Sequence, residues 1–96
     1  MTKELLAIDI SEPLEGKEEE TIAVLGEFYE LLQRKGYCRD ELYRDAQDRK
    51  VMLDLRWWSS EEAARQAHED PDVHRFWKKL GNLIRMRKVY ERLDKV

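Results

Sequence analysis

The stretch that decides the fold lies at residues 51–62 and reads VMLDLRWWSSEE. Its first eight positions alternate, which is typical of a β-strand with two different faces. One face carries Val51, Leu53, Leu55 and Trp57, and the other carries Met52, Asp54, Arg56 and Trp58. The next residues resemble a capping box, with Ser59 as the helix cap and Glu62 as its partner. We therefore expect a strand that leads directly into a helix.

Earlier in the chain, the pattern predicts two more strands and one long helix. Residues 5–10 alternate as a strand that stops before Pro13. Residues 17–36 place apolar side chains at a 3.6-residue period and end on a glycine, as an amphipathic helix does. A weaker strand is expected over residues 41–46, joined to the strand at residues 51–58 by a polar turn.

Later in the chain, the pattern predicts a broken helix and a last strand. The helix that follows Trp58 is expected to run to His68. Asp70 and Pro71 then restart it, because aspartate is a good N-cap and proline a good first helical residue. The new helical segment covers residues 71–80. Residues 83–93 form the last strand, with Ile84, Met86 and Tyr90 expected on one face.

The element order is βαββαβ, which predicts an α+β fold of the ferredoxin-like type. In this split βαβ arrangement a four-stranded antiparallel sheet has two helices on one face. The chain of 96 residues is expected to form a single domain over residues 1–96. Either Trp57 or Trp58 must then lie on the sheet face that no helix covers. Exposed apolar patches usually mark interfaces, so we expect a homodimer that stacks sheet on sheet.

Composition excludes several classes of protein. Eighteen Lys and Arg against 21 Asp and Glu give a net charge of −3, and no basic face for nucleic acid is indicated. Cys38 is the single cysteine, and the two histidines, His68 and His74, lack zinc-site spacing with it. We therefore expect no metal, and the dimer is the expected source of extra stability. Neither a signal peptide nor a membrane span is indicated, and a cytoplasmic location is expected.

Charged residues also occur on the predicted strands. Asp9, Asp54, Arg56, Arg85 and Arg87 could share a sheet face with Trp58. We expect them to form a salt-bridge network in the dimer interface. The alternative is an excess of positive charge presented to an anionic ligand.

The residues around the central strand resemble a known family. Residues 55–63, LRWWSSEEA, followed by residues 67–73, AHEDPDV, are similar to the antibiotic biosynthesis monooxygenase family of dimeric α+β barrel proteins. The matching positions are Trp58, Ser60, Ala63, His68 and Pro71. Such a motif is a better marker of fold than of reaction. The resemblance implies one of several activities, since the family includes cofactor-free oxygenases of phenols or quinols and haem-degrading enzymes.

Cofactor-free oxygenation needs a dry aromatic pocket and a group that deprotonates the substrate. Trp58 and Trp77 are the candidate walls. The candidate catalytic residues are His68 and Arg56, with His68 as proton acceptor because histidine titrates near neutral pH. His74 and Tyr43 are further candidate contacts for a small aromatic substrate. We thus expect a cofactor-independent monooxygenase or related oxidoreductase.

The haem-degrading branch of the family fits less well. The resemblance places its iron-ligating histidine at Trp77, and the first strand offers Asp9 where that branch has an asparagine. His74 lies one helical turn before Trp77 as an alternative ligand. We therefore expect no cofactor, with haem as the less favoured alternative.

A non-catalytic interpretation remains open beside the enzyme. Trp58 and Trp77 could simply fill the core, and His68 could serve only the negative end of its helix. The alternative function is a dimeric ligand-binding or interaction module, and an isomerase or lyase is a third. An apolar cavity with His68 or Arg56 pointing into it would favour the enzyme.

Overall fold

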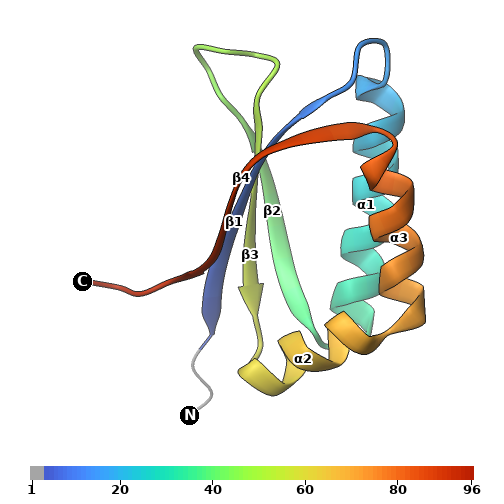
Figure 1. Ribbon diagram of the computed structural model, residues 1–96. Helices are drawn as coiled ribbons and strands as arrows, with labels where there is room; N and C mark the ends of the chain where they lie inside the picture. The colour runs from blue at the N-terminus through green and yellow to red at the C-terminus, as the bar shows by residue number, and fades with distance from the viewer. Residues whose placement is uncertain (1–3) are drawn as a thin grey trace.

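The computed structural model describes residues 4–96, which fold into one sheet and one helical layer. The elements in chain order are β1 (Leu5–Pro13), α1 (Glu18–Arg34), β2 (Cys38–Arg44), β3 (Met52–Trp58), α2 (Glu61–Glu69), α3 (Pro71–Gly81) and β4 (Ile84–Leu93). The sheet is antiparallel with strand order β2-β3-β1-β4. Helices α1 and α3 lie side by side against one face, and α2 lies across the end of the sheet (Figure 1). The predicted α+β ferredoxin-like fold is confirmed, with three helices instead of two.

Helix α1 supplies most of the core because its apolar residues recur on one side. Val24, Leu25, Phe28 and Leu32 are all buried, and they pack with residues of the sheet and of α3 in one hydrophobic cluster. Glutamates occupy the first turn of α1, where they suit the positive end of the helix dipole. Gly36 follows the helix with φ of 75°, which permits the sharp turn into β2.

The alternation of β3 decides which side chains lie under the helices. Met52, Asp54, Arg56 and Trp58 are buried, whereas Leu53, Leu55 and Trp57 are only partly buried. The even-numbered residues therefore face the helices and the odd-numbered ones face the uncovered side. The expectation of a charged network in a dimer interface is wrong for Asp54 and Arg56, which lie inside the protomer. Arg85 and Arg87 instead pair with Glu12 at the exposed edge.

Strand β4 does not keep the simple alternation that its sequence suggests. Its pairing with β1 shifts register twice, between Leu6 and Ile8 and between Ile10 and Ser11. Met86 stands opposite Ser11, on the helix side, but Tyr90 stands opposite Ile8, on the uncovered side. The prediction that Met86 and Tyr90 share a face is wrong because each bulge moves the following residues to the other face.

Two local boundaries also differ from the prediction. β2 begins at Cys38, three positions before the expected start, because the buried Cys38 pairs with Trp58. Ser60, and not Ser59, is the N-cap of α2, since its Oγ accepts the Ala63 N–H at 3.0 Å. The Ser59 hydroxyl donates instead to the carbonyl oxygen of Gly36 at 2.8 Å.

The corner between α2 and α3 is held by Asp70. Its Oδ1 accepts the backbone N–H of Asp72 at 2.8 Å, which caps α3. Its Oδ2 accepts from Lys35 Nζ and from Tyr37 Oη, each at 2.7 Å. The hydrogen bonds from Lys35 and Tyr37 lower the pKa of Asp70. The corner is thereby tied to the end of α1, which fixes the position of α2 relative to the sheet.

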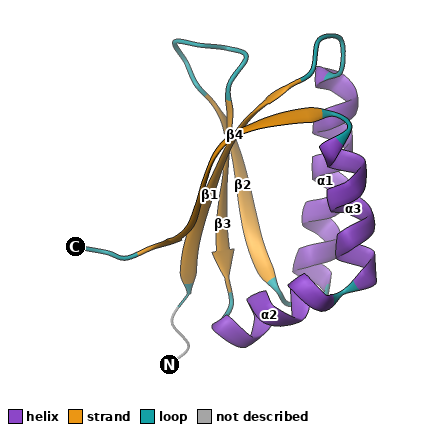
Figure 2. Ribbon diagram, viewed as in Figure 1, coloured by secondary structure: helices purple, strands orange, loops and turns teal. Residues whose placement is uncertain are grey.

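The long β2–β3 turn projects at the opposite end of the sheet from α2 (Figure 2). Within residues 4–96, no helix has both the length and the apolar character needed to cross a membrane.

Candidate functional site

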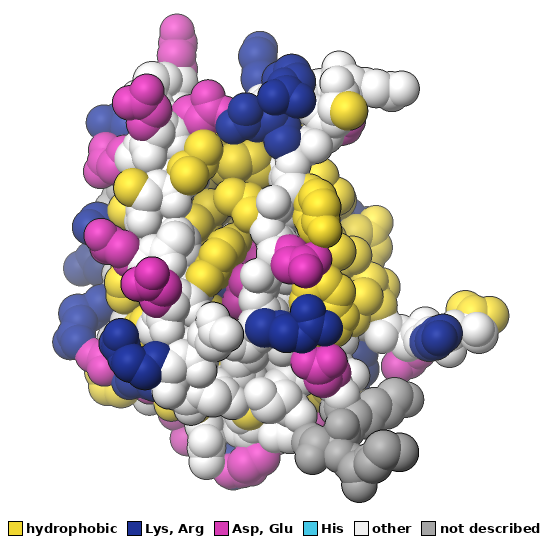
Figure 3. All heavy atoms as spheres, turned by 180° about the vertical axis from the view of Figure 1, so that it is seen from behind, with side chains coloured by type: hydrophobic (Ala, Val, Ile, Leu, Met, Phe, Trp, Pro, Cys, Tyr) yellow, Lys and Arg dark blue, Asp and Glu magenta, His cyan; other side chains and the backbone are white. Residues whose placement is uncertain are grey.

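A pocket of about 620 Å³ lies between the helix-facing side of the sheet and helices α2 and α3. The face seen from behind, on which no histidine is visible, is not the one that the pocket residue His68 occupies, and it too shows hydrophobic side chains between the helices and the sheet (Figure 3). The residues that line the pocket include Asp9, Arg56, Trp58, His68, Trp77 and Glu91. A neighbouring pocket of about 400 Å³ shares Asp9, Arg56 and Trp77 with it. The molecule therefore offers room for a small organic ligand beside both aromatic and charged groups.

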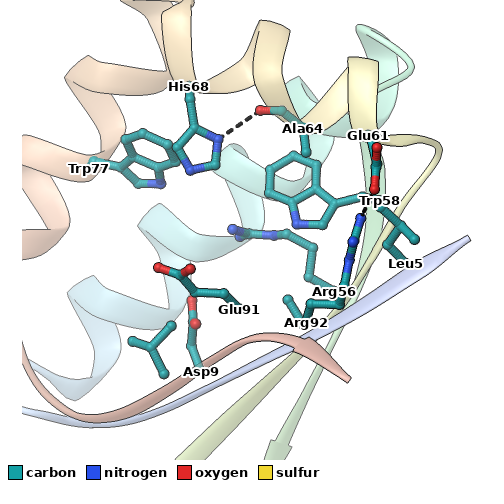
Figure 4. Close-up of a pocket in the computed structure, with 12 residues that line it drawn as sticks. Leu5, Asp9, Arg56, Trp58, Glu61, Ala64, His68, Trp77, Glu91 and Arg92 are labelled. Carbon is teal, nitrogen blue, oxygen red and sulfur yellow. Dashed lines mark hydrogen bonds and ion pairs between the residues drawn. The ribbon is translucent and has the colours of Figure 1, made fainter. Parts of the chain in front are cut away.

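Three aromatic rings form one end of the pocket. The ring centroids of Trp58 and His68 are 5.9 Å apart, and those of His68 and Trp77 are 5.1 Å apart. Figure 4 shows the imidazole of His68 between the two indoles. The Trp58 side chain projects from β3, and that of His68 projects from α2. A planar ligand could contact either indole while it reaches the imidazole.

The hydrogen bond of His68 determines which ring nitrogen carries its proton. Nδ1 lies 2.7 Å from the carbonyl oxygen of Ala64, one turn earlier in α2 (Figure 4). Because a carbonyl oxygen can only accept, Nδ1 is the donor, and in the neutral ring Nε2 has a free lone pair. This nitrogen can accept a proton from a hydroxyl group in the pocket.

The guanidinium group of Arg56 is already hydrogen-bonded to two acidic side chains. Its Nε donates to Asp40 Oδ2 at 2.8 Å, and its Nη2 donates to Asp54 Oδ2 at 3.1 Å. Burial lowers the pKa of Arg56, but the charges of Asp54 and Asp40 outweigh that effect, so the pKa lies above its usual value. Arg56 therefore stays charged and is held within the sheet.

Acidic groups outnumber this buried arginine. Asp9 stands directly opposite Asp54 in the β1–β3 pairing. Burial raises the pKa of Asp54 to about 8, opposed by Arg56 and aided by Asp40 and Asp9. The second oxygen of Asp54, Oδ1, has no hydrogen-bond partner among residues 4–96, so nothing there stabilises its charge. Burial also raises the pKa of Asp9.

The structure brings four of the six predicted site residues together. Arg56, Trp58, His68 and Trp77 all line the pocket. His74 stacks on Trp77 at 5.7 Å between ring centroids, but its Nε2 contacts the backbone oxygen of His68 and it does not line the pocket.

Tyr43 lies away from this group. It pairs with Leu53 and is exposed on the uncovered face of the sheet, where its hydroxyl donates to Glu41 at 3.0 Å.

Asp9 and Glu91 also line the pocket, although the sequence pattern does not mark them as site residues. The sequence places Asp9 on a charged sheet face and at the position where the haem-degrading branch has an asparagine, and its alternation with Leu6 and Ile8 is a sufficient signal for its side of the sheet. Glu91 reaches the pocket only because of the bulges in the pairing of β4, and the sequence carries no signal for these.

Within residues 4–96, no group of three or more His, Cys, Asp or Glu side chains is arranged to hold a metal ion. Cys38 is buried, and burial raises the pKa of its thiol above the usual value, so it is not a nucleophile in this arrangement.

Solved structures with the same fold include enzymes and uncharacterised proteins. SnoaB, a cofactor-independent oxygenase from Streptomyces nogalater, is 17% identical with a TM-score of 0.79, over 98% of this chain and 97% of that chain. A protein of unknown function from Bacteroides thetaiotaomicron, described as a possible oxidoreductase, is 13% identical with a TM-score of 0.79, over 95% and 99% of the two chains. A conserved protein from Methanosarcina mazei is 11% identical with a TM-score of 0.79, over 96% and 95%. At these identities the likeness establishes the fold.

Sequence comparison adds the family. No curated protein sequence matches the chain. The sequence model described as antibiotic biosynthesis monooxygenase matches residues 7–79, which include β1 from its third residue and nearly all of α3. Since that match spans well over half of the chain, the protein belongs to the antibiotic biosynthesis monooxygenase family.

Proposed function

We propose that the protein is a cofactor-independent monooxygenase that acts on a planar phenol or quinol bound in the pocket between the sheet and α2. The observation that carries this proposal is the position of His68 between Trp58 and Trp77, with Nδ1 held by Ala64. The indoles would bind the flat ring, and Nε2 would take the proton of its hydroxyl group.

The chemistry needs only the substrate and dioxygen. Transfer of the phenolic proton to His68 Nε2 leaves an electron-rich phenolate, which gives one electron to dioxygen. The resulting superoxide and aryloxyl radical combine to form a carbon–oxygen bond, and the peroxide takes up a proton. Loss of water from this hydroperoxide, with the hydrogen on the same carbon, leaves a carbonyl group. All electrons come from the substrate, so the reaction balances without a cofactor.

Two features support the absence of a cofactor from this reaction. The fold neighbour SnoaB is described as a cofactor-independent oxygenase. At the position where the family resemblance would place a haem-ligating histidine, this chain has Trp77, whose indole nitrogen is a donor without a lone pair for a metal.

We further propose that the protein acts as a homodimer. The uncovered face of the sheet carries a group of apolar side chains at odd-numbered positions of β3 and even-numbered positions of β1 and β4: Leu6, Ile8, Ile10, Leu53, Leu55, Trp57 and Tyr90. Figure 1 shows no helix on this side, and the C-terminal residues run toward it. A second copy of the same face would remove these groups from water.

Measurement of oxygen uptake with a panel of naphthols and hydroquinols distinguishes the proposed oxygenase from a non-catalytic binding module. The proposal predicts uptake that is proportional to protein concentration for at least one member of the panel. Binding of these compounds without any uptake above the protein-free rate would support the non-catalytic module instead.

A further inference from the structure

Both arginines that line the pocket already form ion pairs with acidic side chains of the protein. Arg56 is bonded to Asp40 and Asp54. Arg92, from the end of β4, donates to Glu61 at the start of α2, and Figure 4 shows this pair closing one side of the pocket. An anionic ligand would therefore have to displace a carboxylate to find a free guanidinium group.

Two carboxylates of the pocket are not committed in this way. Asp9 from β1 and Glu91 from β4 both line the cavity, and neither forms an ion pair with another residue of the described range 4–96. They belong to the strand side of the pocket, whereas His68 projects from α2 on the other side (Figure 4). A flat ligand placed between them would meet hydrogen-bond acceptors at both ends.

Charge and hydrogen bonding then favour the same kind of ligand. The lining carboxylates of Asp9, Glu61 and Glu91 outnumber the lining arginines, and the charge of Arg56 is already paired with Asp40. The remaining donors in the wall are the neutral indole N–H groups of Trp58 and Trp77. A hydroxyl group can donate to either carboxylate, and such charge-assisted hydrogen bonds are the strong ones. A carboxylate on the ligand would instead face like charges in a partly desolvated site.

We propose that Asp9 and Glu91 determine specificity, so that the pocket admits neutral aromatic diols and excludes aromatic carboxylates. One hydroxyl of the diol donates to His68 Nε2, and the other donates to the carboxylates on the strand side. The inference rests on the proposed function only in taking this pocket as the substrate site.

The test compares two ligands that differ by one charge. Dihydroxynaphthalene and dihydroxynaphthoate are titrated into the full-length protein without oxygen, and binding is followed by quenching of tryptophan fluorescence. The expected result is that the diol binds at least about tenfold more tightly, a difference of about 1.4 kcal/mol. The preference should shrink as salt is added, because salt screens the repulsion.

Variants then assign the preference to the two carboxylates. Asp9→Asn with Glu91→Gln should reduce the preference to about threefold or less, that is, by about 0.7 kcal/mol or more. Glu91→Gln alone, at an exposed position, serves if the double variant does not fold, and should reduce the preference part of the way. Glu30→Gln, an exposed change on α1 away from the pocket, is the matched control and should keep it.

Equal binding of the two ligands to the wild type, tighter binding of the naphthoate, or no binding of either would overturn the inference. So would a preference that stays at the wild-type value in the Asp9→Asn, Glu91→Gln protein or in Glu91→Gln alone. The binding test measures no turnover, so it can be separated from the proposed function. If the diol binds with the expected preference but the oxygen-uptake experiment shows no oxidation, the oxygenase is contradicted and the specificity inference stands.

Discussion

His68 carries three properties at one position: it lines the pocket, it lies between two indoles, and it has one ring nitrogen tied to its own helix. The sequence indicates these residues because Trp58 lies at the end of a predicted strand, and His68 and Trp77 lie on the two predicted helices that follow it. It could not indicate the bond to Ala64 as the feature that frees Nε2.

Replacement of His68 by alanine removes the proposed proton acceptor. We expect the rate of oxygen consumption to fall by about 10²-fold or more, the usual contribution of general-base catalysis. Glu30→Gln, an exposed change on α1 away from the pocket, is the control and should keep the rate. A His68→Ala protein that keeps the full rate would show that another group takes the proton.

Asp54 makes the stability of the protein depend on pH. Burial raises its pKa from 3.8 to about 8, so between these values the folded protein holds a proton that the unfolded chain has lost. This contribution to stability is complete below about pH 4 and is lost as the pH rises through about 8. The free energy of unfolding should fall by up to about 1.4 kcal/mol per pH unit in this window.

Urea unfolding at several pH values, for the wild type and Asp54→Asn, measures this effect. The asparagine variant mimics the protonated side chain and should show a shallower decline with pH. Parallel curves for the two proteins would mean that Asp54 is ionised in the folded state.

Helix α2 is the element that closes the pocket, and its start depends on one hydroxyl group. The Ser60 Oγ accepts the Ala63 N–H, while Glu61 in the first turn pairs with Arg92 of β4. Ser60→Ala should lower the free energy of unfolding by about 1 kcal/mol, as the loss of an N-cap does. Ser60→Asp, which can still cap, should restore most of that loss. Equal destabilisation by both changes would indicate that Ser60 acts through something other than the cap.

At the scale of elements, the sequence predicted what local patterns encode. The alternation of β3, the period of α1 and the Asp70–Pro71 break all appear as expected. The bulges of β4 depend on its pairing with β1, which lies more than seventy positions away in the chain. For the same reason, the bonds from Lys35 and Tyr37 to Asp70 were not predictable, since only the folded chain brings these residues together.

For the molecule as a whole, the uncovered sheet face is the main feature that one chain does not explain. Arg39 lies over Trp57 there, with its guanidinium carbon 4.2 Å from the centre of the ring. The sequence predicted that one tryptophan of the Trp57–Trp58 pair would face this side, but not which one. In the structure Trp58 lies on the helix-facing side together with Asp54 and Arg56, and Trp57 lies on the uncovered side.

Sedimentation equilibrium tests the proposed dimer. At micromolar concentration we expect twice the mass of the 11.6 kDa chain. Leu55→Glu, which places a charge on the uncovered face, should give a monomer, because a charge buried without a partner is costly. Lys78→Glu, on the exposed surface of α3, is the control and should remain dimeric. A wild-type particle of single-chain mass would contradict the dimer.

We propose that an aromatic hydroxyl compound is oxygenated in this pocket without a cofactor. The most direct measurement supplies isotopically labelled dioxygen and the naphthol and hydroquinol panel to protein treated with a chelator. We expect oxygen uptake that scales with protein concentration, label in the product, and loss of both in His68→Ala. The contradicting result is a protein that binds the diols but consumes oxygen no faster than the protein-free control with every compound of the panel.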